Sequence, residues 1–225
     1  MIVFTFISLV AIAQEEAIPS DLSETPPSPP RHKQYYLFSP RISITVPHPI
    51  SNSAFKKTFV GLYDLNAGFN LMLYKGVFVG GVFKNAELQI TPNKIQGYNA
   101  SMQLIGYAFK AGGDFYANDK NNILISTSIA IGQNNTKFVS IKTKNPSEHP
   151  ISGFKSSYVE PEVNIFFLIE ANFGIGASAS YSIIKRNFDP YELYLNEWAP
   201  FGKDNSGSTS YFSFGFGCYY GFSKK

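Results

Sequence analysis

The segment TFVGLYDLNAGFNLML, residues 58–73, constrains the fold more than any other part of the chain. Successive side chains of an extended strand point to opposite faces. The odd positions from Phe59 to Leu73 are apolar, tyrosine or glycine, whereas the even positions include Asp64, Asn66 and Asn70. The segment therefore predicts a long strand with one apolar face and one face whose central residues are mostly small or polar.

The same alternation recurs along the chain and predicts eight strands. We place them at residues 40–47, 57–73, 75–88, 99–116, 122–140, 156–169, 172–186 and 209–223. Short connections fall at residues 74–76, 118–121 and 170–171, and they alternate with longer ones at 48–56, 89–98, 141–155 and 187–208. Short turns at one end and long loops at the other are typical of outer-membrane barrels.

The composition of the polar face indicates which side points inward. That face is rich in Gly, Ser and Asn, whereas a soluble exterior favours long Lys, Glu and Arg side chains. Small polar residues suit the narrow lumen of an eight-stranded barrel, so the apolar face is expected to contact lipid. Barrel closure follows because backbone groups in hydrocarbon must all be paired.

The predicted fold is therefore all-β, an eight-stranded antiparallel up-and-down transmembrane β-barrel with short periplasmic turns and long extracellular loops. Aromatic residues near the strand ends are expected to form interfacial girdles: Phe59, Phe115, Phe173, Phe212, Tyr220 and Phe222. The alternative is a soluble, lipocalin-like carrier whose apolar face surrounds a small hydrophobic ligand.

Two segments precede the predicted barrel of residues 37–225. Residues 2–13 form an apolar run that ends in Ala11-Ile12-Ala13, which predicts that residues 1–13 are a signal peptide cleaved between Ala13 and Gln14, although no basic residue precedes the run. Residues 14–36 are polar and proline-dense, and they predict an extended periplasmic linker. The single cysteine, Cys218, excludes an internal disulfide.

The pattern resembles the small outer-membrane β-barrel proteins of Gram-negative bacteria, of the OmpA/OmpX type. The resemblance spans residues 37–223 and is clearest in YVEPEVNIFF (158–167) and YFSFGFGCYYGF (211–222). It implies outer-membrane lipid and lipopolysaccharide as surroundings and the barrel-assembly machinery as a partner. Members commonly end on an aromatic residue that this machinery reads, whereas here Phe222 is followed by SKK, residues 223–225.

Charged residues on the lumen-facing parity predict an interior polar network. They are Arg41, Asp64, Lys84, Lys110, Asp114, Glu160 and Glu162. Buried charges must be paired or solvated, so we expect a salt-bridged plug in which Glu160 or Glu162 pairs with Lys84 or Arg41. The alternative is a gated ion path or a proton-sensitive switch.

The last long loop carries a second candidate site. Asp189 and Pro190 predict a helix start, and Glu192 fits a capping box. The residues that then share one helical face are Tyr191, Tyr194, Leu195 and Trp198. This face is expected either to bind an envelope protein, a glycan or lipopolysaccharide, or to fold back onto the barrel rim.

Signals for catalysis are weak. His48 and His149 fall in predicted outer loops, and Glu148 adjoins His149, but no nucleophile accompanies them. No metal-ligand cluster or phosphate loop is present in the sequence, so no cofactor is expected, and the net charge of +3 does not favour nucleic acid.

The leading prediction is a non-enzymatic outer-membrane barrel with a structural or adhesive role through its outer loops. The alternatives are a narrow pore for ions or small solutes, an assembly component contacted through the proline-rich linker, and a lipid enzyme at the rim.

Overall fold

A computed structural model describes residues 35–90, 98–118, 120–142, 152–189 and 208–222. The predicted signal peptide, most of the linker, His149 and the aromatic face of the last loop lie outside these ranges. In the described part of the chain, no helix has the length and apolar character needed to cross a membrane.

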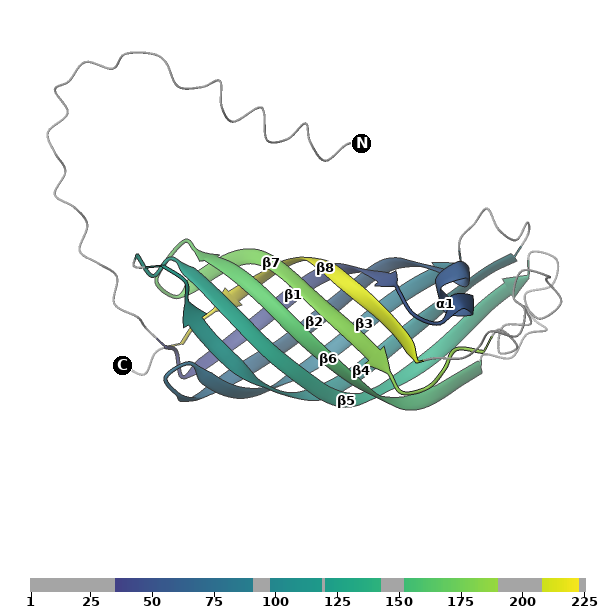
Figure 1. The fold of residues 1–225 in the computed structure, drawn as a ribbon, viewed down its shortest axis with the longest axis horizontal. Coiled ribbons are helices and arrows are strands. Elements are labelled where there is room, and N and C mark those ends of the chain that lie inside the picture. Colours follow the sequence, from purple (N-terminus) through teal and green to yellow (C-terminus); the bar gives the residue numbers. More distant parts are fainter. Residues whose placement is uncertain (1–34, 91–97, 119, 143–151, 190–207, 223–225) are drawn as a thin grey trace, which may run out of the picture.

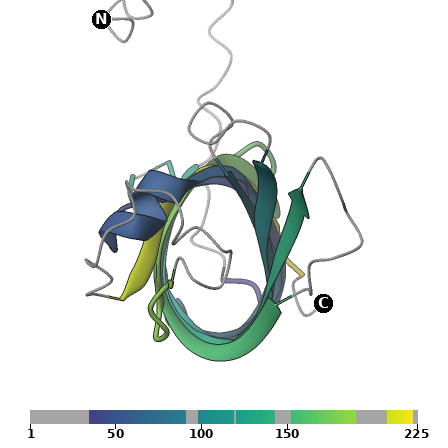
Figure 2. The ribbon, with the colours of Figure 1, turned by 90° about the vertical axis from the view of Figure 1, so that its right-hand side faces the viewer.

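Eight antiparallel strands form a closed barrel in which each strand pairs with its neighbours in the sequence and the last pairs with the first. They are β1 (Phe38–Pro49), β2 (Phe59–Tyr74), β3 (Val77–Ile90), β4 (Tyr98–Tyr116), β5 (Ile123–Lys142), β6 (Ser152–Leu168), β7 (Phe173–Ile184) and β8 (Thr209–Tyr220). Figure 1 shows the tilt of the strands, and Figure 2 shows the closed ring from one end. The predicted fold class is confirmed.

The two ends of the barrel differ as expected. At the turn end, Lys75 and Gly76 join β2 to β3 with φ angles of 34° and 98°, the positive values that a tight hairpin turn requires. Asn118 closes the β4–β5 turn, because its side-chain oxygen accepts hydrogen bonds from the backbone of Asn122 and Ile123. The first residues of β1 and the last of β8 lie at this same end (Figure 1).

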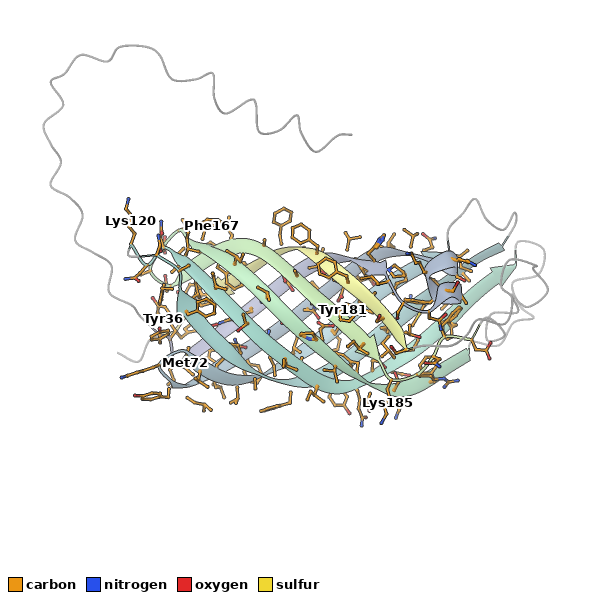
Figure 3. All side chains as sticks on the ribbon, in the orientation of Figure 1. Tyr36, Met72, Lys120, Phe167, Tyr181 and Lys185 are labelled. Carbon is orange, nitrogen blue, oxygen red and sulfur yellow. The ribbon has the colours of Figure 1, made fainter. Side chains whose placement is uncertain are left out.

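The outward face is apolar and the inward face is largely polar near the middle of the barrel. Ile44 and Phe216 are 59% and 73% exposed, whereas Asp64 and Ser126 are both 0% exposed. Side chains radiate from the outer wall in Figure 3. This distribution is the inverse of a lipocalin, whose apolar residues line the interior, and it fits a wall surrounded by lipid.

Inward-facing glycines let the strands approach closely enough for a narrow barrel. A Cβ atom at Gly176 would lie 1.7 Å from the carbonyl oxygen of Ile165 on the neighbouring strand. At Gly132 it would lie 2.0 Å from the carbonyl oxygen of Tyr107. Any larger residue at either position would have to displace the adjacent backbone.

The prediction for one girdle residue, Phe59, is wrong: strict alternation along β2 assigns it to the outer wall, whereas its side chain is inside the barrel. The β2–β3 register shifts between Gly61 and Tyr63, so the parity of β2 changes there. Val60 is therefore exposed on the outer wall, while Phe59 is 3% exposed inside the barrel. A bulge of this kind leaves no clear mark in the sequence.

The first long connection also differs from the prediction. Strand β1 continues to Pro49, so His48 lies in a strand and is exposed, rather than lying in an outer loop. A short helix, α1 (Ser53–Thr58), follows, and the side chain of Asn52 caps it by accepting a hydrogen bond from the backbone N–H of Phe55 at 3.1 Å. Six residues are too few for a helical period to be recognised.

The lipid-facing assignment predicts a depth-dependent cost for a charge on the outer wall. Height is counted from the strand ends at the turn end of the barrel. Ile44 is six residues from Phe38, the first residue of β1, and Val60 is fourteen residues from Tyr74, the last residue of β2. With roughly 2.5 Å of height per residue in a tilted strand, only Ile44 lies within an apolar band of about 25 Å. Ile44→Arg should therefore lose about 2–4 kcal/mol of folding free energy, and Val60→Arg about 0–1 kcal/mol.

The measurement is urea unfolding from phospholipid vesicles, with the mobility shift on SDS gels between unboiled and boiled samples as the readout of the folded state. Equal costs at the two positions would contradict a lipid-facing wall at Ile44.

Candidate functional site

The lumen is filled in three layers, which we name from the loop end to the turn end. The outer plug is an apolar cluster that contains Phe55, Phe59, Phe138, Phe188 and Tyr211. The ion-pair band contains the charged residues predicted from the sequence. The inner cluster contains Tyr36, Leu124, Phe166, Leu168 and Tyr219.

Lys84 is the centre of the ion-pair band. Its Nζ lies 2.9 Å from Asp64 Oδ2 and also contacts Glu160 Oε2. Further hydrogen bonds satisfy the carboxylates: Ser213 donates to Asp64 at 2.9 Å, and Ser182 donates to Glu160. Five strands, β2, β3, β6, β7 and β8, are thus joined across the lumen through this ammonium group and its two carboxylates.

Arg41 joins the band to the inner cluster. Its guanidinium lies 2.5 Å from Asp114 Oδ2 and donates to Ser126 Oγ at 2.5 Å. The same group lies over the rings of Phe78 and Phe166, 5.1 and 5.7 Å from their centroids. Arg41 provides a planar cation that both pairs with a carboxylate and stacks on aromatic rings. A Lys side chain, which has no planar group, does not reproduce this combination.

Lys110 completes the band by binding Glu162 at 2.6 Å. Asn164 donates to the other oxygen of that carboxylate at 2.5 Å. The sequence-based pairing of Glu160 with Lys84 is therefore present in the structure. Glu162, in contrast, pairs with Lys110, and Arg41 pairs with Asp114.

The outer plug was not anticipated from the sequence. The ring of Phe188 lies 5.9, 5.3 and 5.9 Å from those of Phe55, Phe59 and Phe138, respectively, measured between centroids. Asn52 fixes this arrangement by donating to the backbone oxygen of Phe188 at 3.2 Å. These phenylalanines come from α1, β2, β5 and the segment after β7, so only the closed fold brings them together.

The inner cluster closes the turn end. Tyr36 is buried there, and its hydroxyl donates to the backbone oxygen of Ala171 at 2.5 Å. Burial raises the pKa of Tyr36, and the nearby Tyr220 adds to this effect. The last residue of the predicted linker thus packs against the barrel.

Little open space remains between the layers. Among the described residues, a cavity of about 10 Å³ lies beside Arg41, Lys110 and Glu162, and another of about 10 Å³ lies beside Tyr36 and Asp114. Each is close to the minimum that holds one water molecule. The described lumen is therefore a packed core and not a continuous channel.

A cationic groove lies on the outer wall near the loop end. Its volume is about 450 Å³, and its lining includes Lys155, Lys185, Arg186 and Gln133. The Arg186 guanidinium also lies over the ring of Phe154, 3.9 Å from its centroid. Figure 3 shows Lys185 toward the loop end, away from Tyr36 and Lys120. This site was not predicted from the sequence, because strand alternation singles out charges that face the lumen, whereas Lys155 and Lys185 are exposed on the outside.

Groups of three or more His, Cys, Asp or Glu side chains that could hold a metal ion are absent from the described ranges. His48 is on the outer wall, directly opposite Phe212 of β8. The predicted outer-loop position of His48 is therefore wrong.

Comparison with known proteins finds similarity only at the level of structure. No protein-family model matches the chain, and no curated protein sequence matches it. Similar solved structures include Neisserial surface protein A, with 12% identity and a TM-score of 0.51 over 82% of this chain and 97% of that chain. Ail, the attachment invasion locus protein of Yersinia pestis, has 15% identity and a TM-score of 0.46 over 82% and 97%. Outer membrane protein OprG from Pseudomonas aeruginosa has 11% identity and a TM-score of 0.44 over 83% and 96%.

The predicted resemblance to small outer-membrane β-barrels is thus confirmed for the fold, by the closed eight-stranded barrel and its likeness to Neisserial surface protein A.

The Lys84 cluster predicts a large asymmetry between two lysine substitutions. Lys84→Met would leave Asp64 and Glu160 buried without a cation, which should cost about 3–5 kcal/mol of folding free energy. Lys110→Met should cost less, because Asn164 still donates to Glu162. Urea unfolding from vesicles would measure both.

Adding Asp64→Asn and Glu160→Gln to Lys84→Met should restore much of the lost stability, since the orphaned charges are then removed. A triple variant no more stable than Lys84→Met would argue against the ion pairs as the cause.

Proposed function

We propose that this protein is a non-enzymatic, integral outer-membrane protein that binds the phosphate-bearing sugars of lipopolysaccharide at its outer rim. The observation that carries the proposal is the cationic groove formed by Lys155, Lys185 and Arg186. Location in a Gram-negative outer membrane, reached after signal-peptide cleavage and insertion by the assembly machinery, is part of the proposal.

The height of the groove supports a polar partner. Lys155 is thirteen residues from Leu168, the last residue of β6, and Lys185 is twelve residues from Phe173, the first residue of β7. At roughly 2.5 Å per residue these positions lie about 30 Å above the turn end, beyond an apolar band of about 25 Å. The cations therefore stand where the phosphates and core sugars of the outer leaflet begin.

Charge complementarity favours an anionic partner over a neutral one. Lys137 on β5 is exposed on the same wall and pairs across the strands with Gly153, two residues from Lys155. Gln133 and Ser157 are exposed, line the groove and supply neutral hydrogen-bonding groups. This mixture of cations and hydroxyls suits a phosphorylated sugar.

The last long loop begins next to this groove. Residues 187–208 follow Arg186 directly, and they include the predicted binding face of Tyr191, Tyr194, Leu195 and Trp198. We propose that this aromatic face extends the same binding region, since aromatic rings stack on sugars while cations bind phosphates. An adhesive role toward other glycans would use the same surface.

The lumen does not favour the rival function of a pore. Apolar layers lie on both sides of the ion-pair band, and the cavities within the described lumen hold about one water each. Reconstituted in planar bilayers, the protein should give no stable single-channel current. A steady single-channel current through the wild-type protein would show that it conducts ions and would favour the pore function.

Lipopolysaccharide binding should depend on the groove cations. We expect the triple variant Lys155→Gln, Lys185→Gln, Arg186→Gln to bind lipopolysaccharide at least tenfold more weakly, because a basic residue near an anionic membrane surface contributes about 1 kcal/mol. Binding would be measured by titrating fluorescent lipopolysaccharide onto the protein in detergent.

The control is Lys56→Gln with Lys57→Gln, which removes two exposed cations of α1 at the same end of the barrel and is compared with the double variant Lys155→Gln, Lys185→Gln. This control should bind like the wild type, and dephosphorylated lipopolysaccharide should not distinguish the triple variant from the wild type. An equal loss of lipopolysaccharide affinity in the control would mean that binding depends only on net charge. That result would contradict a binding site at the groove.

A further inference from the structure

The small pocket beside Tyr36 and Asp114 lies inside the barrel at the turn end. Its volume is about 10 Å³, close to the minimum that holds one water molecule. Asp114 is buried, whereas its neighbour Phe115 is exposed on the outer wall, so the carboxylate points into the lumen. Figure 3 shows Tyr36 and Met72, which also line the pocket, at this end of the barrel.

One oxygen of the Asp114 carboxylate has no partner. Asp114 is 6% exposed, and its Oδ2 binds Arg41 at 2.5 Å, whereas its Oδ1 has no hydrogen-bond partner in the described part of the chain. Arg41 lines the neighbouring cavity beside Lys110 and Glu162 and does not line this pocket. A charged oxygen buried without a partner is costly, so a group that satisfies Oδ1 is expected in the pocket.

The ion-pair band carries one more negative charge than positive charge. Its four carboxylates are paired with three cations, because Lys84 is shared between Asp64 and Glu160. Among the described lumen residues, Asp114 Oδ1 is the one carboxylate oxygen that is both buried and without a partner. A cation at this oxygen would neutralise the excess charge of the band, whereas a water molecule would not.

The walls of the pocket suit a cation. Four tyrosines, Tyr35, Tyr36, Tyr116 and Tyr219, line it together with Met72. The ring centroids of Tyr35 and Tyr116 are 5.7 Å apart, and those of Tyr36 and Tyr219 are 6.3 Å apart. Aromatic faces attract cations, and hydroxyl oxygens and a thioether sulfur offer electron pairs to them.

The pocket lies close to the water at the turn end. Asp114 is two residues from Tyr116, the last residue of β4, which places it roughly 5 Å above that end. Tyr36 precedes β1 and is fixed there by the hydrogen bond from its hydroxyl to the backbone oxygen of Ala171. An ion can therefore reach Asp114 without crossing the outer plug or the hydrocarbon.

We propose that this pocket binds one monovalent cation, either sodium, potassium or ammonium, with Asp114 Oδ1 as its charged ligand and the tyrosine rings around it. These three ions are similar in size to a water molecule or smaller. The bound ion stabilises the barrel at the point where the predicted linker enters it. The proposal is independent of lipopolysaccharide binding, because the cationic groove lies toward the other end of the barrel.

The first test compares urea unfolding from vesicles in sodium, potassium, ammonium and choline chloride at equal ionic strength. An ion present at about ten times its Kd should raise the ratio of folded to unfolded protein about elevenfold. Choline is too large for the pocket and should have no such effect. In crystals soaked in rubidium chloride, which replaces potassium, an anomalous peak should lie in contact with Asp114 Oδ1.

The double variant Arg41→Met, Asp114→Asn removes the ligand and its partner together, so it leaves no lone charge at this position. It should lose both the ion-dependent stabilisation and the rubidium peak. The matched control is Lys110→Met, Glu162→Gln, which removes another ion pair of the band with the same change in charge. This control should keep both.

Stabilisation by at least one of the three ions, lost in Arg41→Met, Asp114→Asn and kept in the control, supports the proposal. Equal stability in all four salts would mean that a water molecule or a proton satisfies Asp114, and it would overturn the proposal. Ion-dependent stabilisation that persists in Arg41→Met, Asp114→Asn also overturns it. If that variant does not fold, the wild-type crystals decide: a rubidium peak at Asp114 supports the site, and a peak only elsewhere or no peak contradicts it.

Discussion

The requirement that every backbone amide in hydrocarbon be hydrogen-bonded controls the whole structure. An open sheet would leave two unpaired edges, so β8 must return to β1. Closure with only eight strands makes the lumen narrow, and glycines such as Gly176 are needed where neighbouring backbones come into contact. The lumen then has to be filled by its own side chains, because a void would forfeit packing energy.

Filling a narrow tube with charges is stable only if each charge finds a partner. Three cations, Arg41, Lys84 and Lys110, are set among four carboxylates and a set of serines and asparagines. Apolar layers above and below exclude water from the ion-pair band, which strengthens the interactions within it. The same layers leave no continuous path for ions, so the feature that stabilises the barrel also argues against conduction.

The sequence predicted the strands, their order and the members of the ion-pair band, because alternation with a period of two assigns each side chain to one face. It did so wherever a strand was regular. It misplaced Phe59, since the bulge after Gly61 shifts the parity, and it assigned His48 to a loop because Pro47 and Pro49 resemble a strand end. The outer plug was missed because α1 and Phe188 reach the lumen from irregular segments, whose contacts follow no periodic pattern.

The candidate binding surfaces lie where these constraints are relaxed. Above the hydrocarbon a strand need not be apolar outside, so Lys155 and Lys185 can face outward and remain hydrated. Within the hydrocarbon, Pro161 is tolerated only because the remaining ladder of β5, β6 and β7 still closes the barrel. The effect of Pro161 is local, because β6 and β7 keep the same register on both sides of it.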